Sequence, residues 1–283
     1  MKTTEHTFGA RDGLQLFYRA WLPDGAPKEA VALIPGFGDH GARHASVAEH
    51  LAAHGFAVYA YDLRGNGRSH GTRAHVDAFD DYVTDTAVFF DLVRQSAPRR
   101  RVTLFGHSFG AVVALAYAEK NPKGPVGLIL SSPFLKLRIK VHEWRTRFVH
   151  VASKFTPTSP IRNPVKGEML SHDPAVAEAF DNDPFRHELA TVGWAEEMLN
   201  AQRRVRRGAA GLSCPVLVIY SPDDPISDPA AIESFMQKVT AADKTALRYE
   251  GYLHETYNDV GKEAVLADIE AWLSQRAARR QLI

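Results

Sequence analysis

Short, continuous apolar runs alternate with longer segments of helical period along most of the chain, and this alternation limits the fold most tightly. The runs cover residues 30–34, 56–61, 102–105, 126–130, 216–220 and 245–249. They are too short for helices and too continuous for half-exposed strands, which predicts parallel strands buried on both faces of a sheet. Segments of helical period lie around and between them, at residues 44–54, 82–96, 108–120, 229–239 and 260–276. We therefore expect a doubly wound α/β sheet with right-handed crossovers.

Two stretches depart from this alternation. Residues 6–10 and 14–22 flank Asp12-Gly13, a dipeptide typical of tight turns, and predict an amino-terminal β-hairpin. Residues 133–212 contain no clear buried strand and are dominated by helical period and turn residues. A connection of about 80 residues is too long for a compact sheet, so we expect an inserted helical subdomain there. Residues 1–132 and 213–283 would then form the α/β domain.

Charge and composition exclude several classes of protein. The formal net charge is +1 in 283 residues, which argues against nucleic acid as the main partner. The single cysteine, Cys214, permits no intramolecular disulfide and no cysteine cluster for a metal. The amino terminus lacks the apolar run of a signal peptide, and no run of roughly 18 apolar residues occurs. We therefore expect a soluble, cytoplasmic protein.

A candidate nucleophile lies between a predicted strand and a predicted helix. Gly106-His107-Ser108-Phe109-Gly110 has the form Gly-x-Ser-x-Gly, follows the strand-like residues 101–105 and opens the helix-like residues 111–120. This is the setting of a nucleophile elbow, a tight and strained turn whose glycines leave room beside the serine. We predict Ser108 as a nucleophile; the alternative is an ordinary strand-to-helix turn.

A serine nucleophile needs a base, an orienting acid and donors for an oxyanion. In this kind of fold the acid and then the histidine follow the serine along the chain, in loops after strands. By position both Asp223 and Asp224 qualify as the acid, and His254 qualifies as the base. The Phe109 N–H is one expected oxyanion donor. The glycine-rich loop at residues 34–41 supplies the other, with Phe37 as the donor; a simple glycine-rich turn is the alternative.

A second glycine-rich loop covers residues 62–69 and also follows a predicted strand. It lacks the lysine of a Walker motif and the spacing G-x-G-x-x-G, so a phosphate cradle is not expected. We interpret it as structural, with Asp62 and Arg64 bracing neighbouring loops.

Together these motifs resemble the α/β-hydrolase superfamily, and more narrowly its monoacylglycerol lipase and lysophospholipase-like branch. The resemblance covers nearly the whole chain and rests on the stretches PGFGDHGARH, YDLRGNGRSHG, LFGHSFGA, LSHDPAVAEAFDNDP, YSPDDPISD and YEGYLHE. It implies an α/β-hydrolase fold: a mostly parallel eight-stranded sheet with helices on both faces. It also implies that the insertion at 133–212 follows the sixth strand as a helical cap over the active site.

The resemblance assigns roles to particular residues. It makes Ser108 the nucleophile, His254 the base and Phe37 and Phe109 the oxyanion donors. The family pattern D-x-x-x-D begins at Asp224, which favours Asp224 over Asp223 as the acid. One departure is that the family usually has His-Gly at the start of the oxyanion loop, where this chain has Pro35-Gly36. Pro35 has no imidazole to brace the loop. The resemblance requires no metal and no organic cofactor.

The predicted cap carries an apolar stripe in a basic environment. The stripe recurs at helical spacing and consists of Phe134, Leu137, Val141, Trp144, Phe148, Val151 and Phe155. Eight Lys or Arg residues and one acid, Glu143, lie between residues 134 and 166. Such a helix can lie on a lipid surface and collect dispersed substrate; alternatively, the stripe packs onto the rest of the protein. The residues expected to contact substrate are Phe37, His107, Trp144 and Phe148.

The expected activity is hydrolysis of a lipid carboxylic ester, most directly monoacylglycerol to fatty acid and glycerol. A lysophospholipase or a general carboxylesterase is the alternative. A serine aminopeptidase or a thioesterase would use the same triad, and a non-catalytic hydrolase-like binding module would typically lack a triad member. The expected partner is a lipid ester, with transient lipid-surface contact through the cap. The basic residues 203–207 are expected to be a solvated helix end.

Overall fold

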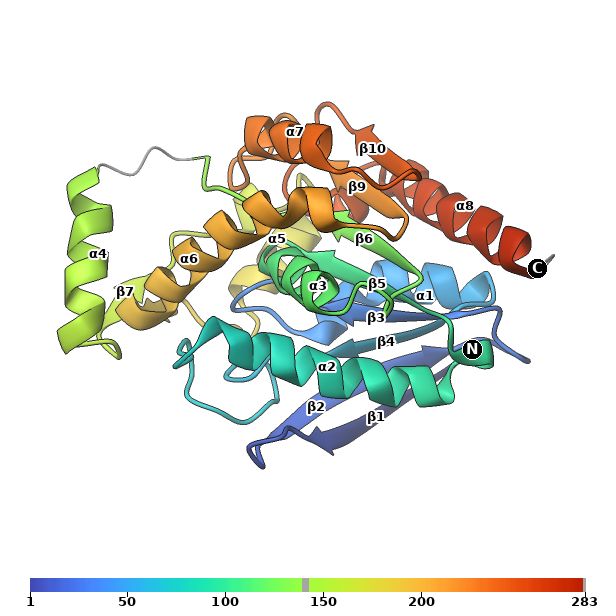
Figure 1. Cartoon of the computed structure of the whole chain (residues 1–283), viewed down its shortest axis with the longest axis horizontal. Coiled ribbons are helices and arrows are strands. Elements are labelled where there is room, and N and C mark those ends of the chain that lie inside the picture. The colour runs from blue at the N-terminus through green and yellow to red at the C-terminus, as the bar shows by residue number, and fades with distance from the viewer. Residues whose placement is uncertain (139–142, 282–283) are drawn as a thin grey trace.

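The computed structural model describes residues 1–138 and 143–281, and its centre is an eight-stranded sheet (Figure 1). The strand order is β1-β2-β4-β3-β5-β6-β9-β10. β1 (Lys2–Gly9) and β2 (Gln15–Leu22) form the expected hairpin, and β2 also pairs antiparallel with β4 (Ala57–Tyr61). The other pairs are parallel and join β4 to β3 (Ala30–Ile34), β5 (Val102–His107), β6 (Gly127–Ser131), β9 (Val216–Tyr220) and β10 (Lys244–Arg248). The mostly parallel sheet predicted from the sequence is confirmed.

Helices cover both faces of the sheet, which explains why its central strands are largely apolar. α1 (Ala45–Ala53) and α8 (Lys262–Gln281) pack on one face, and α2 (Phe79–Ser96), α3 (Phe109–Lys120) and α7 (Pro229–Lys238) lie on the other. Every residue of β3, β4, β5, β6 and β9 is buried. The apolar cores on the two faces supply the main stabilisation of the fold.

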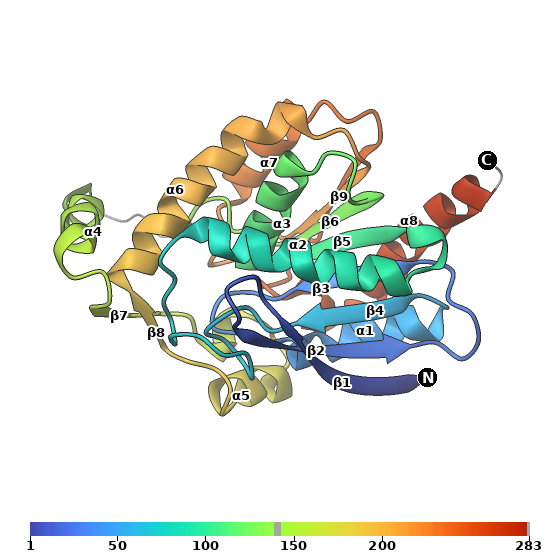
Figure 2. The same ribbon diagram turned by 60° about the horizontal axis from the view of Figure 1, so that its bottom comes forward.

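The segment between β6 and β9 adds helices and two short strands that are not part of the central sheet (Figure 2). They are α4 (Glu143–Phe155), β7 (Pro160–Arg162), α5 (Pro174–Asp181), β8 (Leu189–Thr191) and α6 (Val192–Gly208). α6 packs on α3 and reaches α4, which lies at the outer edge of the molecule. β7 and β8 pair antiparallel, a ribbon that the expectation of helices alone missed. Strands of three residues are too short to leave a period in the sequence.

The predicted apolar stripe is not one continuous helix. Phe134 and Leu137 precede α4 in a non-helical connection, where the Phe134 N–H donates to the Ser108 carbonyl (3.1 Å) and Leu137 bridges to Ser227. These tertiary contacts override the helical spacing. Val141 and the side chain of Trp144 lie outside the described residues.

The rest of the stripe is exposed on α4. Phe148 is 60% exposed, Val151 55% and Phe155 80%, so the alternative in which these three pack onto the protein is wrong. Large apolar side chains that share a helix with Lys154 give α4 an apolar and basic surface. Within residues 1–138 and 143–281, no helix is both long and apolar enough to cross a bilayer.

Candidate active site

Ser108 occupies a strained turn between β5 and α3. Its φ of 51° and ψ of −116° lie in a region that costs a non-glycine residue on the order of 1–3 kcal/mol. A Cβ on Gly106 would lie 2.5 Å from the Ala111 Cα, and one on Gly110 would collide with the Ile34 carbonyl, so neither position tolerates a side chain. The Ser108 N–H donates to the Ser131 carbonyl of β6 (2.9 Å), which fixes the turn to the sheet. The elbow geometry predicted for Gly-x-Ser-x-Gly is confirmed.

Asp224 and His254 are hydrogen-bonded at the same end of the sheet. The His254 Nδ1 lies 2.7 Å from Asp224 Oδ2, and both side chains are almost fully buried. Asp224 Oδ1 accepts hydrogen bonds from the N–H groups of Ile226 (2.7 Å) and Ser227 (3.1 Å), which orient the carboxylate. Asp223 is exposed and accepts from the Gly251 N–H (2.8 Å) instead. Of the two aspartates that qualified by position, the structure brings Asp224 to the histidine.

Ser132 joins the loops that carry the acid and the histidine, and sequence reasoning missed it. Its hydroxyl donates to the His254 carbonyl (2.6 Å), and its own carbonyl accepts from the Ser227 hydroxyl (3.0 Å). Ser132 is fully buried, with a φ of 43° that only strong surrounding contacts sustain in a non-glycine residue. No signal in the sequence distinguishes it from the neighbouring Ser131.

The loop after β3 passes close to Ser108. A methyl group on Gly36 would lie 3.6 Å from the Ser108 Cβ, so the loop backbone lies directly beside the serine. Neither the Phe37 N–H nor the Phe109 N–H has a protein acceptor within the described part of the chain. Phe109 also opens α3, whose amino terminus favours negative charge. Two free donors beside a serine hydroxyl can stabilise an oxyanion that forms there.

Asn66 braces this loop. The family usually has a histidine at the start of the loop, where this chain has Pro35. The Asn66 Oδ1 accepts from the Gly38 N–H (2.9 Å) and lies 2.9 Å from the His187 Nε2, while its Nδ2 donates to the Arg64 carbonyl (2.9 Å). The loop is thus held from the glycine-rich loop at residues 62–69 and from the segment before β8. No pattern in the sequence singles out Asn66.

Asp62 and Arg64 have the bracing roles expected of them. Asp62 accepts from the N–H groups of Gly41 and Arg68, at 2.8 Å each, and so links two loops at this end of the sheet. Burial raises the pKa of Asp62 even though these hydrogen bonds oppose the shift. Arg64 forms a two-pronged pair with the buried Asp85, at 2.6 and 2.7 Å.

Trp194 of α6 packs on the loop after β3 and is a third residue that sequence reasoning missed. Its ring stacks on Phe37 with centroids 3.6 Å apart, and Phe37 meets the Phe109 ring edge-on at 6.0 Å. The Thr191 hydroxyl caps the start of α6 by accepting from the Trp194 N–H (3.2 Å). A threonine three residues before a tryptophan is a helix-start signal that could have placed Trp194 in the first turn.

The residues expected to contact substrate lie in different surroundings. Phe37 is half-buried beside the serine. His107 is buried, and its ring lies 5.1 Å from that of His254. Burial is the main cause that lowers the pKa of His107 well below its ordinary value, with smaller contributions from the neighbouring His254 and His44, so His107 is neutral. Phe148 faces solvent on α4. Substrate contact by His107, Phe148 and Trp144 stays a prediction.

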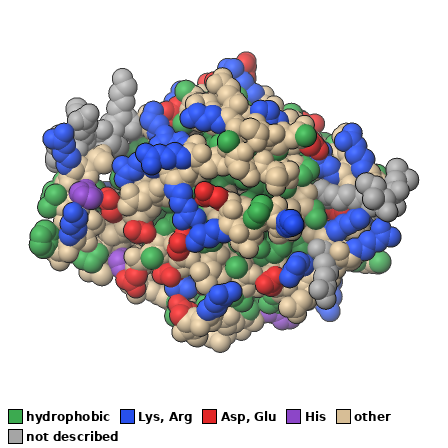
Figure 3. Space-filling view, viewed as in Figure 1, with side chains coloured by type: hydrophobic (Ala, Val, Ile, Leu, Met, Phe, Trp, Pro, Cys, Tyr) green, Lys and Arg blue, Asp and Glu red, His purple; other side chains and the backbone are tan. Residues whose placement is uncertain are grey.

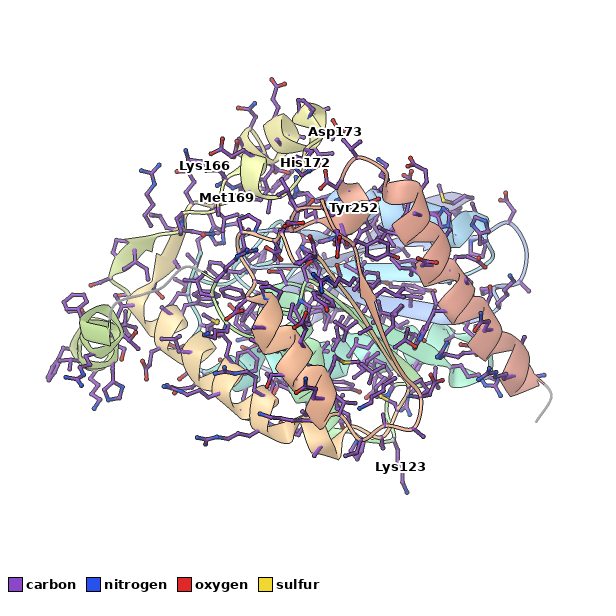
Figure 4. The ribbon with its side chains drawn as sticks, turned by 90° about the horizontal axis from the view of Figure 1, so that it is seen from above. Lys123, Lys166, Met169, His172, Asp173 and Tyr252 are labelled. Carbon is purple, nitrogen blue, oxygen red and sulfur yellow. The ribbon has the colours of Figure 1, made fainter. Side chains whose placement is uncertain are left out.

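The loop that carries His254 is also tied to the segment before α5. Asp259 accepts from the N–H groups of Leu253 (2.7 Å) and His172 (2.6 Å), and the Glu255 N–H donates to the Leu170 carbonyl (2.8 Å). In Figure 4 the labelled His172 and Tyr252 lie at the same edge of the molecule, one from each segment. A displacement of residues 170–172 would therefore shift the loop that carries His254, because Asp259 and Glu255 bond to both segments.

The described residues hold no group of three or more His, Cys, Asp or Glu side chains arranged to bind a metal. What the arrangement supplies is a hydroxyl on a strained turn, an imidazole held by a buried carboxylate, and two free N–H donors. These are the parts that acyl transfer through a serine requires.

Comparison with known proteins agrees with this geometry. The family model described as serine aminopeptidase, S33, matches residues 25–261. The monoacylglycerol lipase of Mycolicibacterium smegmatis is 29% identical over 271 residues, which cover 95% of this chain and 96% of the relative. The human monoglyceride lipase is 30% identical over 274 residues, covering 94% and 89%.

A solved structure is similar throughout. The crystal structure of a monoacylglycerol lipase from Paleococcus ferrophilus superposes with a TM-score of 0.81 at 26% identity, covering 98% of this chain and all of the other. The family match and the nearly full-length similarity to these proteins lead to one assignment. The chain belongs to the family described as serine aminopeptidase, S33, and is an α/β-hydrolase similar to monoacylglycerol lipases.

Proposed function

We propose that this protein is a serine hydrolase that cleaves carboxylic esters of lipids, and that its substrate is a monoacylglycerol. The observation that carries the proposal is the buried 2.7 Å contact between Asp224 and His254 at the same end of the sheet as the strained Ser108. Relatives that are named for monoacylglycerol hydrolysis and match nearly the whole chain support the substrate class.

The proposed reaction proceeds through an acyl-enzyme. His254 Nε2 takes the proton of the Ser108 hydroxyl as Oγ attacks the ester carbonyl carbon. Asp224 accepts the His254 Nδ1–H and stabilises the imidazolium that forms. The Phe37 and Phe109 N–H groups bind the carbonyl oxygen while it carries the negative charge.

The tetrahedral intermediate then collapses to an acyl-enzyme, which water hydrolyses in a second step. The C–O bond to glycerol breaks, and the leaving oxygen receives the proton from His254. A water molecule next attacks the acyl carbon and gives its proton to His254. The Ser108 ester bond breaks, the fatty acid leaves, and the serine recovers its proton.

We also propose that residues 133–212 form a cap and that α4 contacts the surface in which the substrate is dispersed. Exposed Phe148, Val151 and Phe155 would enter the lipid interface, and Lys154 would remain among the headgroups. In vesicle co-sedimentation, the double variant Val151→Ser, Phe155→Ser should bind less than wild type. Its turnover of a short, water-soluble ester should be unchanged. Equal vesicle binding by both proteins would contradict the contact.

The substrate test compares fatty-acid release from a monoacylglycerol and a lysophosphatidylcholine of equal chain length. Preference for the monoacylglycerol supports the proposal, and Ser108→Ala should lose activity by on the order of 10⁴-fold or more. Preference for the phospholipid would make the enzyme a lysophospholipase. Activity on an aminoacyl amide or a thioester, with none on either lipid, would overturn the ester assignment.

A further inference from the structure

A cavity of about 530 Å³ lies between α6 and α7 and shares no lining residue with the site at Ser108. Three arginines of α6, namely Arg203, Arg206 and Arg207, line it from one side. Ser234 and Lys238 of α7 line it from the other. Figure 3 shows Lys and Arg side chains gathered along these two helices. The volume lies in the range of roughly 300–1,000 Å³ that small-molecule sites occupy.

The three arginines share one helix face because they are spaced three and four residues apart. Arg203 donates to the neutral Asn200 side chain (2.6 Å), and Arg206 donates to the Gln202 carbonyl (3.2 Å). Among the described residues, neither these arginines nor Arg207 forms an ion pair.

A fourth arginine on the same helix behaves differently. Arg204 lies outside the cavity and pairs with Asp80 (2.9 Å) and Glu119 (3.3 Å). Lys238, across the cavity, has no acidic partner in the described part of the chain. The acids near this end of α6 therefore neutralise the arginine that faces away from the cavity, and four cations face into it.

Four like charges around one cavity repel each other, and the carboxyl-terminal helix dipoles offset only part of this repulsion. Guanidinium groups present paired N–H donors that match phosphate oxygens, and the Ser234 hydroxyl adds another donor. An anion with a single charge would leave most of the cationic charge unpaired. A ligand with several phosphates would neutralise it.

We propose that this cavity binds a soluble phosphorylated ligand that carries at least two phosphate groups. The site is separate from the hydrolytic site, and its existence does not depend on the proposed ester substrate. The buried Phe235 forms its apolar floor.

Isothermal titration calorimetry with inorganic tripolyphosphate tests the proposal at physiological salt. We expect saturable one-to-one binding, with inorganic phosphate binding more weakly. The double variant Arg207→Ala, Lys238→Ala should bind tripolyphosphate roughly tenfold or more weakly, since it removes two of the four cations available for charge-assisted contacts. Both side chains are exposed, so the variant should fold, and its thermal unfolding checks this.

The control removes the same charge elsewhere. The double variant Lys2→Ala, Arg11→Ala lies in and beside β1, at the opposite edge of the sheet, and should bind tripolyphosphate as wild type does. Absence of saturable binding to wild type, or an equal loss in both variants, would overturn the proposal. Binding to phosphatidylglycerol vesicles that Arg207 and Lys238 support, without binding of tripolyphosphate, would also overturn it and assign the surface to lipid.

Discussion

At the scale of single residues, the loop after β9 contains a natural pair for testing the acid. Asp224 is buried against His254, and its neighbour Asp223 is exposed and bonded to the backbone of Gly251. Both can be changed to asparagine without a change in size. The comparison separates the charge that faces the imidazole from a charge one residue away.

We predict that Asp224→Asn lowers kcat by on the order of 10³–10⁴, because the amide no longer holds the required tautomer of His254. Asp223→Asn should keep kcat within about twofold of wild type, since exposed charges at this distance are well screened. Steady-state hydrolysis of one ester by both variants provides the measurement. A larger loss in Asp223→Asn than in Asp224→Asn would exchange the two assignments.

Ser132→Ala should lower kcat roughly tenfold and leave KM nearly unchanged. The change removes one buried hydrogen bond to the His254 carbonyl, which contributes on the order of 1 kcal/mol to the position of the imidazole. Ser153→Ala, on α4, is a control whose hydroxyl bonds only within its helix. If Ser132→Ala changed thermal stability alone and left kcat intact, its role would be structural.

The sequence predicted those site residues whose position follows from a motif. Ser108 follows from the elbow and His254 from its place after the last strand, whereas the choice of Asp224 needed the family pattern. The roles of Ser132, Asn66 and Trp194 could not be predicted, even though a helix-start signal marks the position of Trp194, because these roles depend on contacts with residues far along the chain. Such contacts leave no local pattern in the sequence.

At the scale of elements, α6 connects the segment between β6 and β9 to the loop beside Ser108. Trp194, in its first turn, stacks on Phe37, and Val205, near its end, is buried in the same core away from that loop. In α6, Trp194 therefore contacts the site, whereas Val205 contributes only to packing.

We predict that Trp194→Ala lowers kcat for a short soluble ester about tenfold, because a stacked ring contributes about 0.5–1.5 kcal/mol to the position of Phe37. It should also destabilise the fold by about 3–5 kcal/mol. Trp194→Phe should retain most of the activity. Val205→Ala should lower the melting temperature with kcat unchanged; an equal loss of kcat in that variant would refute a specific role for Trp194.

The strands of the sheet could be predicted from the sequence. The elements of the segment between β6 and β9 could be predicted only in part. Strands buried on both faces are nearly continuous apolar runs, and such runs can be recognised in the sequence without knowing which strands pair. Phe134 and Leu137 instead follow a helical spacing in a non-helical connection, which contacts Ser108 and Ser227. Tertiary contacts decided the structure there.

At the scale of the whole molecule, buried histidines link stability to pH. Burial is the main cause that lowers the pKa of His107 well below 6.5, and partial burial lowers the pKa values of His50 and His187. Below pH 6.5 the unfolded chain takes up protons that the folded protein does not. The stabilisation that these neutral histidines provide is therefore complete above pH 6.5 and is lost as the pH falls below it.

We predict that the free energy of unfolding decreases between pH 7.5 and 5.5. His107 alone contributes a slope approaching about 1.4 kcal/mol per pH unit in the acidic part of this range. Urea unfolding at several pH values gives the slope, and His107→Gln should make it shallower. Identical slopes in wild type and His107→Gln would show that His107 is not the buried neutral group described above.

The central claim is that Ser108 is the activated nucleophile, and covalent labelling tests it most directly. A fluorophosphonate should phosphonylate the Ser108 Oγ with loss of fluoride, and intact-mass measurement with peptide mapping should find one adduct on that residue. Ser108→Ala should give no adduct, and His254→Ala, still folded, should react far more slowly. An adduct on another residue, undiminished labelling of Ser108→Ala, or a folded wild type that does not react would contradict the account.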